Sequence, residues 1–372
     1  MAKHKIAWLP GDGVGVEVLE AAKIVLDKVG LDADYEHGDI GWEFWMKEGD
    51  PLPERTVELL KRSDAAMFGA ITSKPKKEAE AELAPELSEK GFSYRSPIVR
   101  MRQEFDLYTC LRPTKAYPGN PINLRDDVDI VVFRENTEDL YSGVEFHNVP
   151  EQLSSLLKSI SKPFAKFANL KGEEYALSVK INTKKGCERI IRAAFDYAKE
   201  HGRKKVTIVH KANVVRATDG LFLETGLEVA KDYPGIEVDD ANIDAMTMWL
   251  LKNPDRYDVL VAPNLYGDIV SDLCAQMVGG LGFGCSGNIG ENLAVFEPTH
   301  GSAPKYSGQY KVNPLATILA AKMMLDWLGE DEKASKIEEA VKRVLVEGKT
   351  RTYDMGGSAT TLDMANAVAE KM

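Results

Sequence analysis

Hydrophobic and polar positions follow two different periods along the 372-residue chain. Short runs with few polar residues are typical of strands in a sheet that is covered on both faces. Such runs lie at residues 5–10, 64–70, 129–133, 176–181, 205–210 and 259–264. Longer stretches with apolar residues three and four positions apart predict amphipathic helices, at 16–29, 185–200, 219–232, 315–328 and 332–347. Because the two patterns alternate, the sequence predicts an α/β fold.

Three stretches fit neither pattern. Residues 75–91 are charged and interrupted by proline, which predicts a mobile surface loop. Residues 147–173 are polar and weakly periodic, and we interpret them as an inserted arm. Residues 297–314 form a long stretch rich in Gly, Pro and Ser. A purely structural loop of that length is unusual, so a binding loop is favoured.

Composition narrows the function classes. The chain carries 58 acidic against 47 basic residues, a net charge of -11, which argues against a general nucleic-acid binder. Its length favours two domains. The four cysteines show no CxxC spacing, so neither a thiolate zinc site nor a disulfide framework is indicated. No apolar run is long enough for a signal peptide or a membrane span, and we expect a soluble cytoplasmic protein.

A glycine-rich turn, Gly11-Asp12-Gly13-Val14-Gly15, follows the first expected strand. The dinucleotide-binding fingerprint requires GxGxxG, and the third glycine of that spacing is missing here. A tight turn from strand to helix therefore explains the motif better than a phosphate-binding loop, because glycine serves unusual backbone geometry first.

Arginines are concentrated in one part of the chain, as Arg95, Arg100, Arg102, Arg112 and Arg134. The last of these ends an apolar strand, where an unpaired charge would be costly. One interpretation is a set of ion pairs with the acidic residues that follow, Glu135, Glu138 and Asp139. The other is a cluster of guanidinium groups that binds a substrate with several carboxylates. The residues alone leave both interpretations open.

Asp268 and Asp272 lie four positions apart, just after a strand and at the start of an expected helix. This spacing puts both carboxylates on one helical face, where like charges repel. Capping of the helix N-terminus explains one carboxylate but not comfortably both. We therefore favour a divalent cation held through oxygen, Mg²⁺ or Mn²⁺, with Asp244 as the candidate third ligand.

Tyr141 and Lys211 are the candidates for acid–base chemistry. Lys211 follows a strand without charge, and a lysine held in a site can have a pKa near neutrality. Taken singly, however, a strand-end lysine and a tyrosine at the edge of the core are the simpler interpretations.

Five separated motifs then occur together, LPGDGVG, RENTEDLY, HKAN, PNLYGDIVSD and GNIGENLAVFEPTHGSAPKY. In these motifs the chain resembles the β-decarboxylating dehydrogenases, the family of isocitrate, homoisocitrate and 3-isopropylmalate dehydrogenases. The resemblance runs nearly from end to end and implies the α/β fold of that family, which is not a Rossmann fold. It also favours the catalytic interpretations of Tyr141 and Lys211.

The resemblance implies a division of the chain into three parts. A large coenzyme-binding domain would comprise residues 1–107 and 279–372, and a small dimerisation domain residues 108–138 and 184–278. Residues 139–183 would form a clasp between the subunits of a homodimer. The active site would lie in the cleft, with Lys211, Asn213 and Asp244 donated by the neighbouring subunit.

Roles of single residues follow from the same resemblance. Tyr141 would be the general acid and Lys211 the general base. The substrate carboxylates would be bound by Ser96, Arg102, Arg112 and Arg134. The metal would be bound by Asp244, Asp268 and Asp272. The coenzyme would contact Thr72, Asn213, Glu297, His300, Gly301, Ala303, Lys305, Tyr306, Asn313 and Tyr353.

The pair Lys305-Tyr306 implies NADP as coenzyme. The NADP-dependent isocitrate enzymes carry a Lys-Tyr pair at this place, whereas NAD-dependent members carry an acidic residue that binds the ribose hydroxyls. Tyr353 matches a further tyrosine that contacts the phosphate, but Gly357 stands where an arginine is expected. We therefore expect a preference for NADP that is less strict than in those enzymes.

The resemblance implies metal-dependent oxidative decarboxylation of isocitrate to 2-oxoglutarate and CO₂, the step of the tricarboxylic acid cycle. Ile98 and Phe68 depart from isocitrate enzymes and resemble homoisocitrate dehydrogenases as much, so homoisocitrate or both acids is the alternative. Ser96 and Arg100 suit a charged distal group better than the isopropyl group of isopropylmalate. A non-catalytic regulatory subunit is disfavoured, because the acid–base and metal residues are all present. Phosphorylation of Ser96, as in some relatives, is left open.

Overall fold

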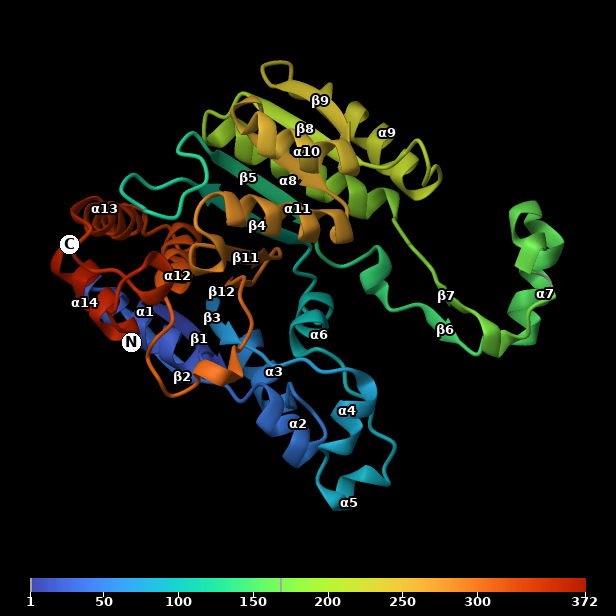
Figure 1. Ribbon diagram of the computed structural model, residues 1–372, viewed down its shortest axis with the longest axis horizontal. Coiled ribbons are helices and arrows are strands. Elements are labelled where there is room, and N and C mark those ends of the chain that lie inside the picture. The colour runs from blue at the N-terminus through green and yellow to red at the C-terminus, as the bar shows by residue number, and fades with distance from the viewer. Residues whose placement is uncertain (1, 168) are drawn as a thin grey trace.

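The computed structural model describes residues 2–167 and 169–372, and its largest feature is a ten-stranded mixed sheet (Figure 1). The strands lie in the order β2-β1-β3-β12-β11-β4-β5-β10-β8-β9. In chain order they are β1 His4–Gly11, β2 Ala33–His37, β3 Ala65–Ala70, β4 Thr109–Lys115, β5 Asp129–Glu135, β8 Lys205–His210, β9 Glu237–Asn242, β10 Val259–Ala262, β11 Cys285–Ile289 and β12 Ala294–Pro298. β11 and β4 run antiparallel to their neighbours, and the other pairs are parallel.

Helices cover both faces of this sheet, which confirms the prediction of a buried α/β sheet. Along β5, Val131 and Phe133 pack against α8 (Lys184–Glu200) and α9 (Thr218–Ala230). Ile130 and Val132 alternate with them and pack against α10 (Ile243–Lys252) and α11 (Asn264–Met277) on the other face. The half made by the two chain ends is covered by α1 Gly15–Val29, α3 Glu54–Lys61, α12 Leu315–Trp327, α13 Asp331–Glu347 and α14 Thr361–Glu370.

Two expectations from the sequence are wrong. Residues 75–91 are not simply a surface loop, since they contain α4 (Lys76–Ala81) and α5 (Pro85–Ser88). Three of their apolar side chains pack on Trp42 and Trp45 of α2 (Trp42–Glu48), namely Ala79, Leu83 and Leu87. Apolar residues spaced four apart therefore anchor a segment whose overall composition is charged.

The second error concerns residues 176–181, which are not a strand of the main sheet. Only β7 (Ala176–Ser178) forms there, and it pairs with β6 (Glu145–His147) in a separate two-stranded ribbon. The ribbon and α7 (Glu151–Ile160) form an arm that projects from the body (Figure 1). The two legs of the arm meet where Asp139 pairs with Ile181. An inserted arm is thus confirmed, and its role as a clasp stays a prediction.

The glycine-rich segment 11–15 is a tight turn, as predicted. Gly11 and Gly13 have φ of +69° and +56°. A Cβ atom on Gly11 would lie 1.9 Å from the carbonyl oxygen of Ala70, and one on Gly13 would lie 2.2 Å from that of Ser302. Only glycine fits at these positions, because both the conformation and the space exclude a side chain.

The remaining global findings concern cysteines, membranes and domains. All four cysteines are buried free thiols. Within the described residues, no helix has both the length and the apolar character needed to cross a bilayer.

The expected domain boundaries near residues 108 and 279 stay a prediction. The sheet is continuous across them, because β4 pairs with β11.

Candidate active site

Three arginines from three elements converge at the middle of the sheet. Arg102 comes from α6 (Pro97–Glu104), Arg112 from β4 and Arg134 from the end of β5. They are only 6%, 8% and 1% exposed. Gly267 allows α11 to lie against β5, since a Cβ atom there would be 2.6 Å from the Cβ of Arg134. The result is a buried cluster of positive charge, which requires anionic partners.

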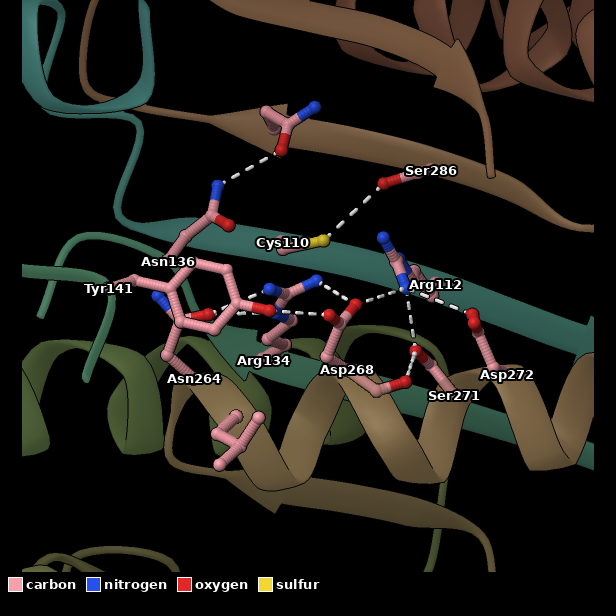
Figure 2. Close-up of polar contacts among 12 residues, drawn as sticks. Cys110, Arg112, Arg134, Asn136, Tyr141, Asn264, Asp268, Ser271, Asp272 and Ser286 are labelled. Carbon is pink, nitrogen blue, oxygen red and sulfur yellow. Dashed lines mark hydrogen bonds and ion pairs between the residues drawn. The ribbon is translucent and has the colours of Figure 1, made fainter. Parts of the chain in front are cut away.

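Asp268 is the partner of this cluster (Figure 2). Arg134 donates to its carboxylate, and Nη1 of Arg112 lies 3.2 Å from Oδ1. The hydroxyl of Tyr141 donates to Oδ2 over 2.6 Å. Burial alone would raise the pKa of Asp268, but the guanidinium groups of Arg134 and Arg112 outweigh it and lower the pKa. Asp268 is therefore a carboxylate at neutral pH.

Asp272 lies one turn further along α11 and is more open, with a side chain that is 60% exposed. Burial raises its pKa against the opposing charge of Arg112, and the neighbouring carboxylate of Asp268 raises it further. Neither aspartate caps the helix, since α11 begins at Asn264. The capping interpretation of this pair is therefore wrong.

The ion pairs expected beside Arg134 are not formed. Its Nε and Nη2 donate to Oδ1 of Asn264, 2.9 and 2.8 Å away. Glu135 instead accepts the backbone amides of residues 137 and 138, and Glu138 accepts from Thr183. Arg112 and Arg134 therefore have Asp268 as their main carboxylate, with Asp272 at the rim, and the buried Nε of Arg112 has no partner.

Arg102 is held by a second buried network that the sequence analysis missed. Its Nε donates to Oδ1 of Asn288 over 2.9 Å, and its Nη2 lies 3.2 Å from Glu297. Asn288 also donates to Glu297 and accepts from Asn136. Glu297, which we expected to contact the coenzyme, is thus engaged with Arg102. A lone amide in a strand gives no sequence signal of such a role.

Tyr141 lies over the cluster, with the guanidinium carbon of Arg134 5.0 Å from its ring centre. Burial raises the pKa of its phenol, and the hydrogen bond to Asp268 raises it further. The phenol is therefore protonated at neutral pH and available as a proton donor.

Lys211, Asn213 and Asp244 lie apart from the arginine cluster. Lys211 and Asn213 follow β8, and Asp244 lies in the first turn of α10. Lys211 donates to Asp244 through Nζ, and this hydrogen bond lowers the pKa of the exposed Asp244 carboxyl. Asn213 is exposed. Asp244 is 68% exposed and Lys211 22% exposed, and no hydrogen bond or ion pair joins either of them to Asp268 or Asp272 within the described chain.

The carboxylates of α11 supply two of the oxygen ligands that a divalent cation needs, but not a third. Asp268 and Asp272 offer hard oxygen ligands on one helical face. Within residues 2–167 and 169–372, however, no three His, Cys, Asp or Glu side chains gather as a metal site. A third carboxylate, as expected of Asp244, would have to come from outside this chain.

A pocket of about 540 Å³ lies between the segment after β12 and η5 (Gly280–Gly282). His300, Gly301, Ala303, Tyr306, Asn313 and Tyr353 are among its lining residues. Burial lowers the pKa of the His300 imidazole, and its buried Nε2 has no partner. Nothing but the oxygen of Ile71, at 3.9 Å, lies near a Cβ on Gly301. An orphaned ring nitrogen and open space beside a glycine fit a planar heterocycle such as adenine.

Lys305 and Thr72, also expected to contact the coenzyme, lie beside residues of the segment after β12, whereas Asn213 and Glu297 lie elsewhere in the chain. The Nζ atoms of Lys305 and Lys311 lie 4.7 and 5.5 Å from the ring centre of Tyr306. Thr72 bonds Ser302 through its hydroxyl, 2.7 Å away. Asn313 is buried and donates to Asp354 over 3.0 Å. Lysines beside exposed tyrosine rings suit a phosphate group.

Two acidic residues that sequence reasoning passed over hold this pocket in shape. Asp12 accepts the backbone amides of Trp42 and Thr72 over 2.7 and 2.8 Å. Glu17, on α1, accepts the amides of Gly308 and Tyr310. Each carboxylate accepts hydrogen bonds from a loop that is far away in the sequence, so only the tertiary structure reveals these contacts.

The substrate-discriminating positions are only partly where we expected them. Ser96 precedes α6, and its hydroxyl makes no capping bond. Arg100 is instead engaged by Asp50 and Glu104 at the surface. Phe68 is 2% exposed and packs in an apolar cluster, against which Ile98 also packs. In this structure Arg100 is thus engaged in ion pairs and Phe68 in core packing.

Known proteins resemble the chain over nearly its whole length. The model of the isocitrate/isopropylmalate dehydrogenase family matches residues 5–368. A 3-isopropylmalate dehydrogenase from Archaeoglobus fulgidus is 43% identical over 98% of both chains. The isocitrate/homoisocitrate dehydrogenase of Thermus thermophilus is 42% identical over 99% of this chain and 98% of its own. Protein DlpA of Legionella pneumophila is 39% identical over 98% of this chain, which spans 58% of DlpA.

A solved structure gives the same result. The crystal structure of isocitrate dehydrogenase from Methylococcus capsulatus matches with a TM-score of 0.86 and 39% identity, over 99% of each chain. Relatives named for different acids thus match at similar identity, and overall similarity does not discriminate between the substrates.

Proposed function

The chain belongs to the isocitrate/isopropylmalate dehydrogenase family, a family of β-decarboxylating dehydrogenases, and we propose that it converts isocitrate to 2-oxoglutarate and CO₂ with NADP. A divalent cation, Mg²⁺ or Mn²⁺, is part of this proposal. Members of the family are generally homodimers that act on small carboxylates with a divalent metal and NAD or NADP. The proposed isocitrate and NADP specificities go beyond those family properties.

The single observation that carries the substrate proposal is the buried cluster of Arg102, Arg112 and Arg134. The three guanidinium groups have three carboxylate partners, Glu297 in the interior, Asp268 partly buried and Asp272 at the rim. The buried Nε of Arg112 has no hydrogen-bond partner, and an unused guanidinium donor in such a cluster suits a substrate with several carboxylates. The free hydroxyl of Ser96, at the N-terminal end of α6, suits a third carboxylate rather than an alkyl group.

In the proposed reaction the arginines orient the acid so that its hydroxyl-bearing carbon faces the coenzyme pocket. A cation at Asp268, Asp272 and Asp244 of a second subunit would polarise the hydroxyl, and later the ketone. Lys211 of that second subunit would accept the hydroxyl proton, and NADP, when bound in the coenzyme pocket, would supply the hydride acceptor. The carbon–carbon bond to the 3-carboxylate then breaks, and its electron pair forms an enolate as CO₂ departs. Tyr141 donates its phenolic proton to the enolate carbon.

Support for NADP comes from the cationic side of the coenzyme pocket. The ammonium groups of Lys305 and Lys311 flank Tyr306, and Lys311 also lies 5.0 Å from the ring centre of Tyr353. A 2′-phosphate would gain charge-assisted hydrogen bonds here, whereas the hydroxyls of NAD would not. Gly357 offers no side chain for a further contact, which agrees with a moderate preference.

The proposal includes a homodimer with shared active sites, because Lys211, Asn213 and Asp244 face outward in the single chain. The arm of residues 139–183 would be the clasp between the subunits, and the two domains would have the boundaries given above. We further expect the enzyme in the cytoplasm.

An absorbance assay at 340 nm tests the proposal, with isocitrate and homoisocitrate each combined with NADP and NAD in the presence of Mg²⁺. We expect the highest kcat/KM with isocitrate and NADP, and loss of turnover with EDTA. Preference for homoisocitrate would replace the substrate, a result favoured by Ile98 and by the 42% identity to an isocitrate/homoisocitrate dehydrogenase. Turnover of neither acid would leave a regulatory subunit or isopropylmalate as the substrate.

A further inference from the structure

A charged junction lies at the root of the arm, outside the site described above. Its centre is Lys180, whose side chain is 15% exposed. The ammonium group donates to Asp219 and lies 3.6 Å from Oδ1 of Asp139. Both carboxylates are fully buried. The same ammonium group lies 4.5 Å from the ring centre of Tyr266. One cation therefore serves two buried anions.

Asp139 holds the segment that carries Tyr141. Its Oδ1 accepts the amide of Leu140 over 2.8 Å, and its Oδ2 accepts the amide of Leu265, at the start of α11, over 3.0 Å. Its own amide donates to the carbonyl of Ile181 over 2.8 Å. Its φ of +69° is unusual for a residue other than glycine. Such a conformation persists only where surrounding contacts impose it. These contacts therefore fix the backbone just before Tyr141.

Asp219 holds the segment that carries Lys211. It lies in the first turn of α9, and its Oδ2 accepts the backbone amide of Lys211 over 2.8 Å. A buried carboxylate therefore fixes the backbone of Lys211, whose side chain donates to Asp244. The two segments are about 70 residues apart in the chain, and Lys180 is the cation that contacts both of their anchors.

The two carboxylates of this junction depend on the same cation, so a change at Lys180 affects both of them. Two carboxylates buried near each other repel strongly, and the N-terminal ends of α9 and α11 offset only part of that repulsion. Loss of the shared cation would leave both charges without an ionic partner, which is costly in a buried site. The structure would relax by releasing one or both carboxylates from the amides that they accept.

We propose that Lys180 is a positioning residue that couples the backbone segments of Tyr141 and Lys211 through Asp139 and Asp219. This rests on the proposed function in one respect, that Tyr141 and Lys211 transfer the protons. If Lys211 serves the active site of a second subunit, the junction links the two sites of a dimer at the root of the arm. Lys180 itself touches neither substrate nor coenzyme.

Hydrogen exchange tests the coupling without any reference to activity. In Lys180→Met, the amides of Leu140 and Lys211 should both exchange faster than in the wild type. Lys185→Met removes an exposed lysine five residues away and should leave both unchanged, while Lys180→Arg should retain most of the protection. Acceleration of neither amide, or of only one, would overturn the proposal.

A second variant covers the case in which Lys180→Met does not fold. Asp219→Asn removes one of the two anions but leaves Lys180 in place, so the charge balance changes at Asp139. Exchange at Leu140 should then change, although Asp219 does not contact Leu140. An unaltered Leu140 amide in a folded Asp219→Asn protein would contradict the coupling.

Kinetics separate positioning from general destabilisation. In Lys180→Met we expect kcat to fall on the order of 100-fold, because misplacement of reacting groups by about 1 Å has effects of that size. KM for the acid should change little, since the arginine cluster is intact, and the solvent deuterium isotope effect on kcat should increase. Equal changes in kcat and KM with an unchanged isotope effect would assign Lys180 a merely structural role. Absence of wild-type turnover would overturn the proposed function but leave the exchange result decisive for Lys180.

Discussion

The arginine cluster and the edge formed by Lys211, Asn213 and Asp244 differ in how much of their geometry one chain supplies. Arg134 is 1% exposed and donates to two side chains, Asn264 and Asp268, that meet it inside the same fold. In the Lys211–Asp244 pair, by contrast, the carboxylate is largely exposed, with side-chain exposures of 22% for Lys211 and 68% for Asp244. The arginine cluster is therefore preorganised within one chain. At the edge formed by Lys211, Asn213 and Asp244, the lysine and the aspartate pair only with each other.

This difference shows which part of the site is ordered before the substrate binds and which part has to rearrange. Burial of three guanidinium groups is stabilised by hydrogen bonds already present in the chain, so little reorganisation is left for substrate binding. At that edge Lys211 and Asp244 neutralise each other, and an approaching subunit and substrate would have to separate them. The predictions below test whether the two regions are halves of one site.

Complementation has the largest expected effect. Arg134→Met and Asp244→Asn should each lower kcat/KM by about 100- to 1,000-fold. When the two variants are coexpressed, each mixed dimer contains one site with both native residues, and activity should reappear. The measurement is turnover of the purified mixture.

Arg100→Met is the matched control, since Arg100 lies on the same helix as Arg102 but pairs with Asp50 at the surface. It should stay active and should not depend on coexpression. Failure of the mixed dimers to recover activity would mean that the two regions do not share a site.

Charge reversal at Lys305 should have the next largest effect. Lys305→Asp should raise KM for NADP by about 10- to 100-fold, the size of one or two lost charge-assisted hydrogen bonds. KM for NAD should change little, and Lys349→Asp, an exposed lysine outside the coenzyme pocket, is the control. An equal rise in both KM values would show that Lys305 does not recognise the phosphate.

Metal binding should change by a smaller factor. Asp272→Asn should weaken Mn²⁺ binding by about 10-fold, because one hard oxygen ligand loses its charge. Titration of Mn²⁺ in the presence of isocitrate measures this directly. Asp326→Asn, which alters a carboxylate paired with Lys322 on α12, serves as the control, and equal affinity in both variants would remove Asp272 from the metal site.

Thermal stability should show the smallest effect. With EDTA at neutral pH, Asp268→Asn should lower Tm, because Arg112 and Arg134 lose their shared carboxylate. The corresponding loss in the free energy of unfolding is about 1 kcal/mol. Asp244→Asn should leave Tm nearly unchanged, since its pair is exposed to water. Equal shifts would contradict the view that only the arginine cluster is preorganised within one chain.

Much of the fold could be predicted from the sequence. Apolar runs identified β1, β3, β5, β8 and β10, because these strands are buried on both faces. The edge strand β9, Glu237–Asn242, contains three acidic residues and gave no such signal. The charged segment 75–91 was misjudged because three apolar side chains suffice to anchor it on Trp42 and Trp45.

The sequence by itself determined the α/β pattern and the family motifs, because local periodicity and the order of the motifs encode them. The spacing of Asp268 and Asp272 also marked these two aspartates, whereas the roles expected of Tyr141 and Lys211 followed only from the resemblance to the family. Only the tertiary structure decided that Arg134 is paired with Asp268 rather than with Glu135. It alone also decided that Glu297 is engaged by Arg102, and that Lys180 joins Asp139 to Asp219. These contacts join residues far apart in the chain, and which charges meet depends on how strands and helices pack, which no local pattern records.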